Sequence, residues 1–168
     1  MEKSLAVANA MILRARAHHN PPTQMKLQKL IYFAHGWHLA LYESPLVGEQ
    51  FQAWPYGPVL PTVYHEFKLF GTSGIDELGT EIVTLPSGRL EWQPPHILDS
   101  SGLINPLLDK IWEVFGKFSG GQLSDMTHAT NSPWKCMRDL YGNMRDIVIP
   151  NDLIKDYFKG LMSHAQES

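Results

Sequence analysis

Eight histidines make metal binding the first chemistry to consider. His35 and His38 lie three residues apart in a helical pattern, near enough to share one ion if both side chains project the same way. Asp125 and His128 repeat this spacing further along the chain. Neither pair is part of a zinc-protease pattern, and neither has a defined third ligand. Histidines that bond a backbone carbonyl and pack their rings explain the pattern more simply, so we expect no metal and no other cofactor.

Cys136 is the single cysteine, which excludes an internal disulfide. Lys135 and Arg138 flank it near the predicted start of a helix, where a thiolate is favoured. However, no nucleophile signature surrounds the cysteine and no base can be assigned to it, so we expect a packed thiol. The chain also lacks a phosphate-binding glycine loop, because Gly120-Gly121 fits the first turn of a helix better. These observations do not predict an enzyme.

Apolar residues at helical spacing predict the elements that would position these groups. Ser4 caps a helix that runs to about Ala17, and Thr23 caps a second helix with apolar residues around most of its circumference. Further helices are expected over 61–70, 107–115, 119–127 and 132–142, and from Asn151, which serves as a cap. The expected fold class is therefore α+β and predominantly α, with about six helices around a central apolar helix.

A small antiparallel sheet completes the expected fold. Residues 81–85 and 89–92 alternate around a Pro-Ser-Gly turn, which predicts a β-hairpin. Residues 46–54 have a mixed alternation that predicts a short strand, broken by the turn residues at 56–58. Ser119 with Gln122 has the spacing of a capping box, and Ser132 with Pro133 is a typical helix start.

Composition limits the classes of partner. Hydrophobic residues make up 43% of the chain and charged residues 18%, which is typical of globular proteins. The net charge of −3 argues against unspecific binding to nucleic acid or to an anionic membrane. The N-terminus has no secretion-signal pattern, and no apolar run is long enough to span a membrane. We therefore expect a cytoplasmic protein with a single domain over residues 1–168.

A DNA-binding helix-turn-helix is one alternative, because two helices are joined by a proline-bearing turn. The second helix offers polar side chains only in its first turns, at Gln24, Lys26, Gln28 and Lys29. A solvated polar edge explains these four residues as well as contacts with base edges would. Nucleic acid is therefore not the expected partner.

Several longer motifs occur in a distinctive order. Residues 25–38 read MKLQKLIYFAHGWH and residues 51–64 read FQAWPYGPVLPTVY. They are followed by LSDMTH at 123–128, by Pro133-Trp134, and by Ile154 with Tyr157-Phe158. Together these blocks resemble the Panacea antitoxin domain, also called the SocA-like or phage-associated genetic element protein A family. The resemblance spans residues 25–158.

The resemblance implies an antitoxin of a bacterial or prophage toxin–antitoxin system that neutralises a cognate toxin by direct protein–protein binding. A branch of the family looks like adaptors that deliver the toxin to an ATP-dependent protease, and this alternative stays open. Two further alternatives come from other classes of function. One is a metal- or ligand-dependent enzyme built on His35, His38, Asp125 and His128, and the other is a DNA-binding repressor.

Trp54, Tyr56, Gly57 and Pro58 are the first candidates for partner binding. They form a rigid turn with two aromatic rings, which is the kind of anchor found at protein interfaces. In the alternative interpretation, Gly57 and Pro58 only set the turn while Trp54 fills the core.

His128 and Trp134 are the second candidates for partner binding. With Thr127 they could form a hydrogen-bonded clamp between two short helices, in which Thr127 supplies the polar partner that a buried Trp or His needs.

Overall fold

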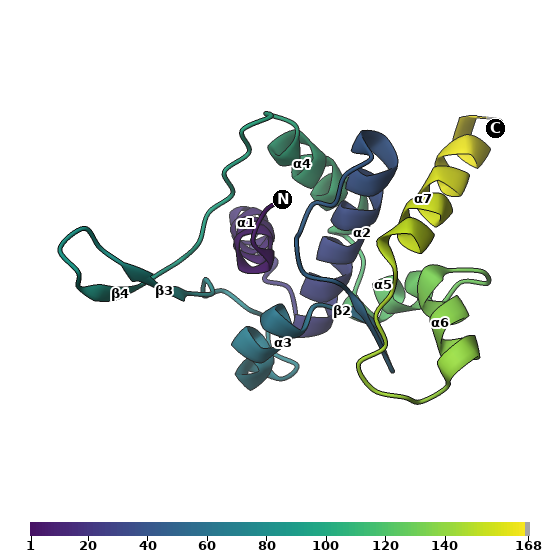
Figure 1. Cartoon of the computed structure of the whole chain (residues 1–168), viewed down its shortest axis with the longest axis horizontal. Coiled ribbons are helices and arrows are strands. Elements are labelled where there is room, and N and C mark those ends of the chain that lie inside the picture. Colours follow the sequence, from purple (N-terminus) through teal and green to yellow (C-terminus); the bar gives the residue numbers. More distant parts are fainter. Residues whose placement is uncertain (167–168) are drawn as a thin grey trace.

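Helix α2 (Gln24–Tyr42) runs through the middle of the protein in a computed structural model that describes residues 1–166 (Figure 1). Four other helices pack most extensively against it: α1 (Ser4–Ala17), α4 (Ile104–Phe115), α5 (Gly120–Thr127) and α7 (Asn151–Gln166). The Thr23 side chain accepts a hydrogen bond from the Lys26 backbone N–H at the start of α2. Because neighbours surround the helix, most of its side chains are buried. The predicted central helix is confirmed.

The described residues contain six α-helices besides α2, as the sequence predicted. The two not yet named are α3 (Pro61–Phe67), which continues into a short 3-10 turn η1 (Lys68–Phe70), and α6 (Pro133–Tyr141). Two antiparallel two-stranded sheets pair β1 (Gln52–Trp54) with β2 (Gly57–Val59), and β3 (Glu81–Thr84) with β4 (Leu90–Gln93). The fold is therefore α+β and predominantly helical. No helix within residues 1–166 is both long and apolar enough to cross a membrane.

The helix caps agree with the sequence in part. The capping box of Ser119 and Gln122 is present, and the Ser132 side chain caps α6. The predicted cap at Ser4 is wrong, because Ser4 is already helical and the residue before it makes no side-chain cap. The predicted cap at Asn151 is wrong for the same reason. Asn151 is the first residue of α7, and its Oδ1 lies 2.9 Å from Nε2 of the buried His35.

The β1–β2 hairpin differs from its prediction. The expected break at 56–58 is confined to the turn, because Gly57 and Pro58 belong to β2, where they pair with Trp54 and Ala53. The other edge of β1 is hydrogen-bonded to residues 147–149, with Ala53 N–H donating to the Ile147 carbonyl and Ile149 N–H donating to the Phe51 carbonyl, both at 2.8 Å. A segment almost a hundred residues away thus supports this small strand.

The β3–β4 hairpin projects away from the helices, and we call residues 81–93 the arm (Figure 1). The buried Asn9 of α1 holds both ends of the arm together. Its Nδ2 donates to the Gly79 carbonyl (3.0 Å) and the Pro95 carbonyl (3.1 Å), and its Oδ1 accepts from the Gly79 N–H (2.8 Å). One side chain therefore fixes the direction in which the arm leaves the body.

We expect Asn9→Ala to lower the free energy of unfolding by about 2 kcal/mol, because it leaves one N–H and two carbonyls unpaired at a buried site. Urea denaturation measures this loss. Relative to the parent, the variant should show a larger increase in amide hydrogen exchange in residues 79–95 than in α2 or α5. Asn143→Ala at an exposed loop is the control and should change stability by less than about 0.5 kcal/mol. Equal losses for the two variants would show that the hydrogen bonds of Asn9 contribute no more to stability than an exposed side chain does.

Candidate partner-binding surface

The β1–β2 hairpin ends in an aromatic ridge, formed by Trp54, Pro55 and Tyr56. Tyr56 is 71% exposed, Pro55 is exposed, and Trp54 is half-buried. The Trp54 ring packs edge-on against Tyr64 of α3, with ring centroids 4.7 Å apart. Trp54 is therefore neither a core residue nor a free surface residue, because one part of its ring is packed and another part is open to solvent.

Two surface hollows flank the ridge, with volumes of about 420 and 520 Å³. Both are lined by Trp54, Pro55 and Tyr64, so these residues form the wall between them. The smaller hollow continues over the first turns of α2 and α5, and the larger one is bordered by Arg138 and Arg145. A ridge between two hollows matches the shape of a site that takes side chains of a protein partner on either side.

Side chains from three helices hold the ridge from behind. Ser124 Oγ of α5 donates to the Tyr56 carbonyl and Trp134 Nε1 of α6 donates to the Trp54 carbonyl, both at 2.7 Å. From α2, the Lys29 ammonium donates to the Pro58 carbonyl at 3.1 Å. These bonds satisfy backbone carbonyls of the hairpin and fix its path.

Lys26, Gln28 and Lys29 are buried, so the predicted solvated polar edge of α2 is wrong. The Gln28 amide bonds both backbone groups of Leu60, accepting from its N–H (2.9 Å) and donating to its carbonyl (3.1 Å). Lys26 Nζ donates to the Gly116 carbonyl at 2.5 Å. Because these side chains are engaged inside the protein, they are not available to read DNA bases.

Burial lowers the pKa of Lys29 from its ordinary 10.5 to about 7. Its hydrogen-bond acceptor is the neutral Pro58 carbonyl, and burial is the cause of the shift. Near neutral pH, Lys29 therefore supports the hairpin while it carries a reduced positive charge. Lys26, Gln28 and Lys29 were the sequence feature that could have indicated support for the hairpin. Their spacing alone, however, fitted a solvated edge equally well.

Gly57 is required by the close approach of α2 and α5 to the hairpin. Its φ of +113° is unfavourable for any residue with a side chain. A Cβ here would lie 2.6 Å from Lys29 Cε and 2.8 Å from Thr127 Oγ1. Gly57 and the buried Pro58 thus shape the start of β2, while the neighbouring Tyr56 is left exposed and Trp54, against the alternative interpretation, does not fill the core.

His128 and Trp134 are brought together, but not as the sequence predicted. Their rings stack with centroids 3.7 Å apart and an angle of 11° between planes. Trp134 Nε1 bonds Trp54, while the Thr127 hydroxyl donates to the Ser124 carbonyl, so the predicted role of Thr127 as the polar partner is wrong. Burial, followed by the nearby Lys29, lowers the pKa of His128. The stacked pair supports the ridge from the side of α5 and α6.

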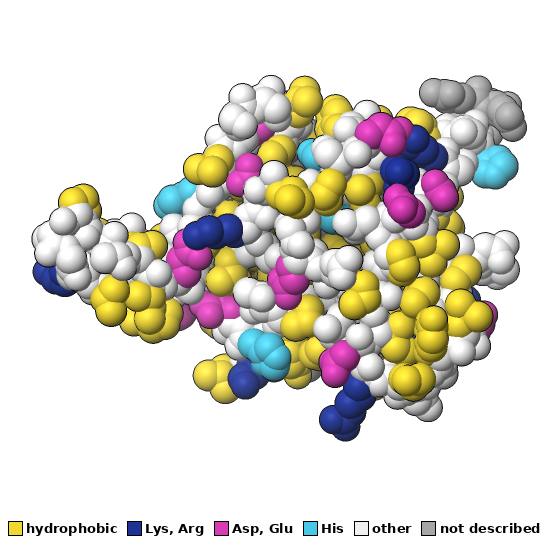
Figure 2. Space-filling model, in the orientation of Figure 1, with side chains coloured by type: hydrophobic (Ala, Val, Ile, Leu, Met, Phe, Trp, Pro, Cys, Tyr) yellow, Lys and Arg dark blue, Asp and Glu magenta, His cyan; other side chains and the backbone are white. Residues whose placement is uncertain are grey.

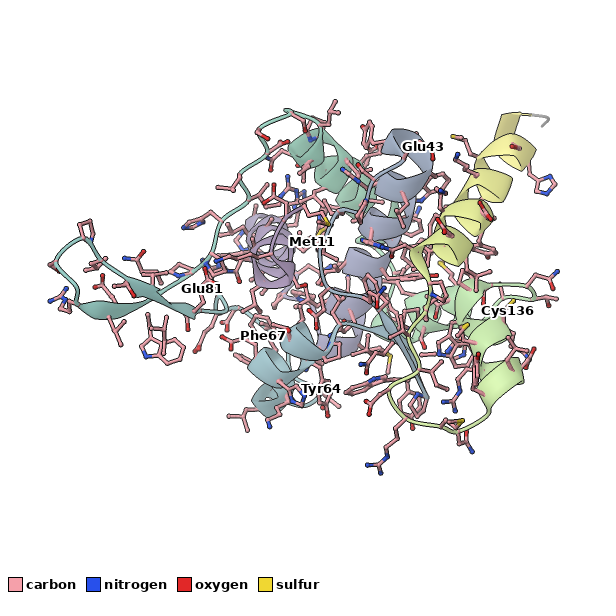
Figure 3. The ribbon with its side chains drawn as sticks, in the orientation of Figure 1. Met11, Glu43, Tyr64, Phe67, Glu81 and Cys136 are labelled. Atoms are coloured by element: carbon pink, nitrogen blue, oxygen red, sulfur yellow. The ribbon has the colours of Figure 1, made fainter. Side chains whose placement is uncertain are left out.

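The histidine pairs do not form a metal site. Within residues 1–166 no three His, Cys, Asp or Glu side chains lie close enough together to hold an ion. His35 contacts Asn151, and Nδ1 of His38 bonds the Ser44 carbonyl at 2.6 Å. The expectation that such histidines pack and bond a neighbour is confirmed for His38 by this carbonyl. Cys136 is half-buried on α6 (Figure 3).

Comparison with known proteins assigns this chain to a family. Residues 27–135 match the family described as Antitoxin SocA-like, Panacea domain. The chain belongs to the SocA-like Panacea family. The matched range contains most of α2, the ridge, the arm, α4 and α5, so the surface described above lies within the Panacea domain.

A curated relative supports the same assignment. The Panacea chain is similar to Antitoxin SocA of Caulobacter vibrioides, with 33% identity over 156 residues. The alignment covers 92% of this chain and 81% of the relative. No solved structure matches the chain. The family is one of antitoxins, which implies a toxin as partner.

Proposed function

We propose that this Panacea domain acts in the cytoplasm as an antitoxin that neutralises its cognate toxin by direct binding through the aromatic ridge. The observation that carries the proposal is the fixed, exposed tip at Trp54–Tyr56. It is hydrogen-bonded from α2, α5 and α6 and stands between two hollows. Membership of an antitoxin family supplies the class of partner.

The rigidity of the ridge favours tight binding. Tyr and Trp are enriched among the residues that dominate interface energies, and they contribute most when packed into a pocket of the partner. A binding segment whose backbone is already held by hydrogen bonds in the free protein loses less conformational entropy on association. Neutralisation at nanomolar affinity corresponds to about −12 kcal/mol, which a few such anchors within an interface of standard size can supply.

Co-expression with the product of the adjacent gene tests the proposal. We expect that product to be toxic alone, and to become harmless and co-purify when this chain is present. Tyr56→Ala should weaken binding at least tenfold, because the exposed ring is the anchor, while circular dichroism stays unchanged. The matched control is Tyr141→Ala on α6, where the ring is 48% exposed and lies outside the ridge; its binding should stay within about twofold.

Toxin turnover distinguishes the two modes of neutralisation. Sequestration predicts that the toxin keeps a normal half-life in the complex, and that protection persists in cells without ATP-dependent proteases. Loss of protection in those cells would instead assign the domain to delivery of the toxin to a protease. If the neighbouring product is harmless or does not co-purify, the proposed function is wrong.

A further inference from the structure

The arm carries an uncharged apolar face that the other described residues, within 1–166, leave exposed. The β3–β4 register places Ile82 opposite Trp92 and Thr84 opposite Leu90, so all four side chains share one face. Ile82 is 55% exposed, Trp92 65% and Leu90 66%. Charged residues lie on the opposite face, where Glu81 pairs with Lys3 and Glu91 with Arg89.

An arm of this kind is poorly suited to remain free in water. A two-stranded hairpin is marginally stable unless a further strand or another element packs against it. Within residues 1–166 the arm forms a sheet of only two strands, so the outer edge of each strand carries unpaired backbone groups. Yet its root is fixed by the three hydrogen bonds of Asn9. The chain thus holds an exposed apolar hairpin in a defined place.

Contact between the arms of two copies of this chain would bury too little area for a stable dimer. The exposed parts of its three apolar side chains amount to roughly 400 Å², given the areas that such residues bury. Two arms packed face to face would bury roughly 800 Å² in total, which is within the range of weak crystal contacts and below that of stable complexes. The arm therefore needs a partner that also touches another part of the body.

The ridge supplies that other part. In Figure 2, hydrophobic side chains gather along the lower side of the arm. The β1–β2 hairpin points to the same side in Figure 1, and Tyr64 is on the lower side of α3, which lies between the two (Figure 3). Leu69, in the turn after α3, is 92% exposed. Arm, Leu69 and ridge together offer roughly 800 Å², the contribution of one partner to an interface of standard size.

We propose that the arm is a second contact for the same toxin. The apolar face of the arm inserts into an apolar cleft of the toxin, and a strand of the toxin pairs with one edge of the arm. This inference rests on the proposed function and adds to it a bipartite interface, with the ridge at one end and the arm at the other. The chemistry required of the toxin is an uncharged cleft beside a free strand edge, because the recognised face carries no charge.

The test uses the full chain and the toxin identified by co-purification. Ile82→Thr and Trp92→Thr place a β-branched residue, which favours strands, at each position and remove apolar surface. We expect the double variant to bind the toxin at least tenfold more weakly, with unchanged circular dichroism and thermal unfolding. Val114→Thr on α4, 39% exposed and outside this surface, is the control and should bind within twofold of the parent. A backbone probe, hydrogen exchange of residues 81–93, should show protection when the toxin is added.

The outcomes separate this inference from the proposed function. If Tyr56→Ala weakens toxin binding while the double arm variant binds normally and its arm gains no protection, the ridge stands and the arm proposal is wrong. If the parent does not bind the toxin, the proposed function itself fails. Sedimentation that shows a stable dimer lost in the arm variant would overturn the proposal in favour of self-association.

Discussion

Gly57→Ala should lower the free energy of unfolding by at least about 3 kcal/mol, the sum of a strained backbone and an overpacked contact. The φ of +113° is unfavourable for alanine, and the new methyl group would fall 2.6 Å from Lys29 Cε. Because Lys29 is itself buried and hydrogen-bonded to the Pro58 carbonyl, it has little room to move away. Urea denaturation with a constant m-value measures the loss.

Two further variants separate strain from crowding at Gly57. Gly142→Ala also places alanine at a positive φ, of +60°, with a ψ of −132°, but a Cβ there meets no atom within 4 Å, so we expect only the loss due to backbone strain, about 2 kcal/mol. Gly57→Ala in a Lys29→Ala background should cost at least about 1 kcal/mol less than in the parent, because the closest clashing atoms are gone. Additive losses in the two backgrounds would contradict the crowding argument.

Acidification should destabilise the protein through His35. Burial lowers the pKa of His35 from 6.5 to about 4; the hydrogen bond to Asn151 raises it and His38 lowers it further. The Val47 N–H points at Nδ1 at 3.5 Å, so protonation of this nitrogen would set two donors against each other. The neutral ring is thus the form that the folded protein accommodates.

The sign of the pH dependence follows from proton linkage. As the pH falls below about 6.5, the unfolded chain protonates this histidine while the folded chain does not, so the unfolded state gains stability. The stability contributed by the neutral ring is fully present above pH 6.5 and is lost as the pH falls toward 4, and the loss over this range is on the order of 3 kcal/mol. His128, whose pKa is also lowered, acts in the same direction.

Urea denaturation at several pH values between 4 and 7.5 measures this loss. His35→Gln should be less stable than the parent at pH 7.5 but should lose much less stability on acidification. His65→Gln, at an exposed position on α3, is the matched control and should keep the dependence of the parent. A parent protein whose stability is flat between pH 7 and 4 would contradict the burial of a neutral His35.

The helices could be predicted because their signals are local. Apolar spacing and caps such as Ser119 and Ser132 act within one or two turns, and both caps are present in the structure. The hairpin at 81–93 could be predicted for the same reason, because its turn lies between its two strands. Its projection from the body could not, because the direction depends on Asn9, some seventy residues away.

The ridge could be anticipated only in part. The aromatic turn at Trp54–Tyr56 was visible, but its supports come from positions such as Lys29 and Trp134, whose partners are set by tertiary packing. A buried lysine has the same local pattern as an exposed one, so α2 seemed to have a solvated edge. The strand-like pairing of residues 147–149 had no local signal, because it consists of two backbone hydrogen bonds to residues 51 and 53.

That late pairing has a consequence for biosynthesis. The ridge at residues 54–56 is completed by Trp134 and by a segment that ends at Ile149, so its contacts join parts of the chain made far apart in time. Non-local contacts of this kind form late, after the intervening chain is ordered. A ribosome must therefore release almost the entire polypeptide before the ridge is complete, and truncated translation products would lack its supports.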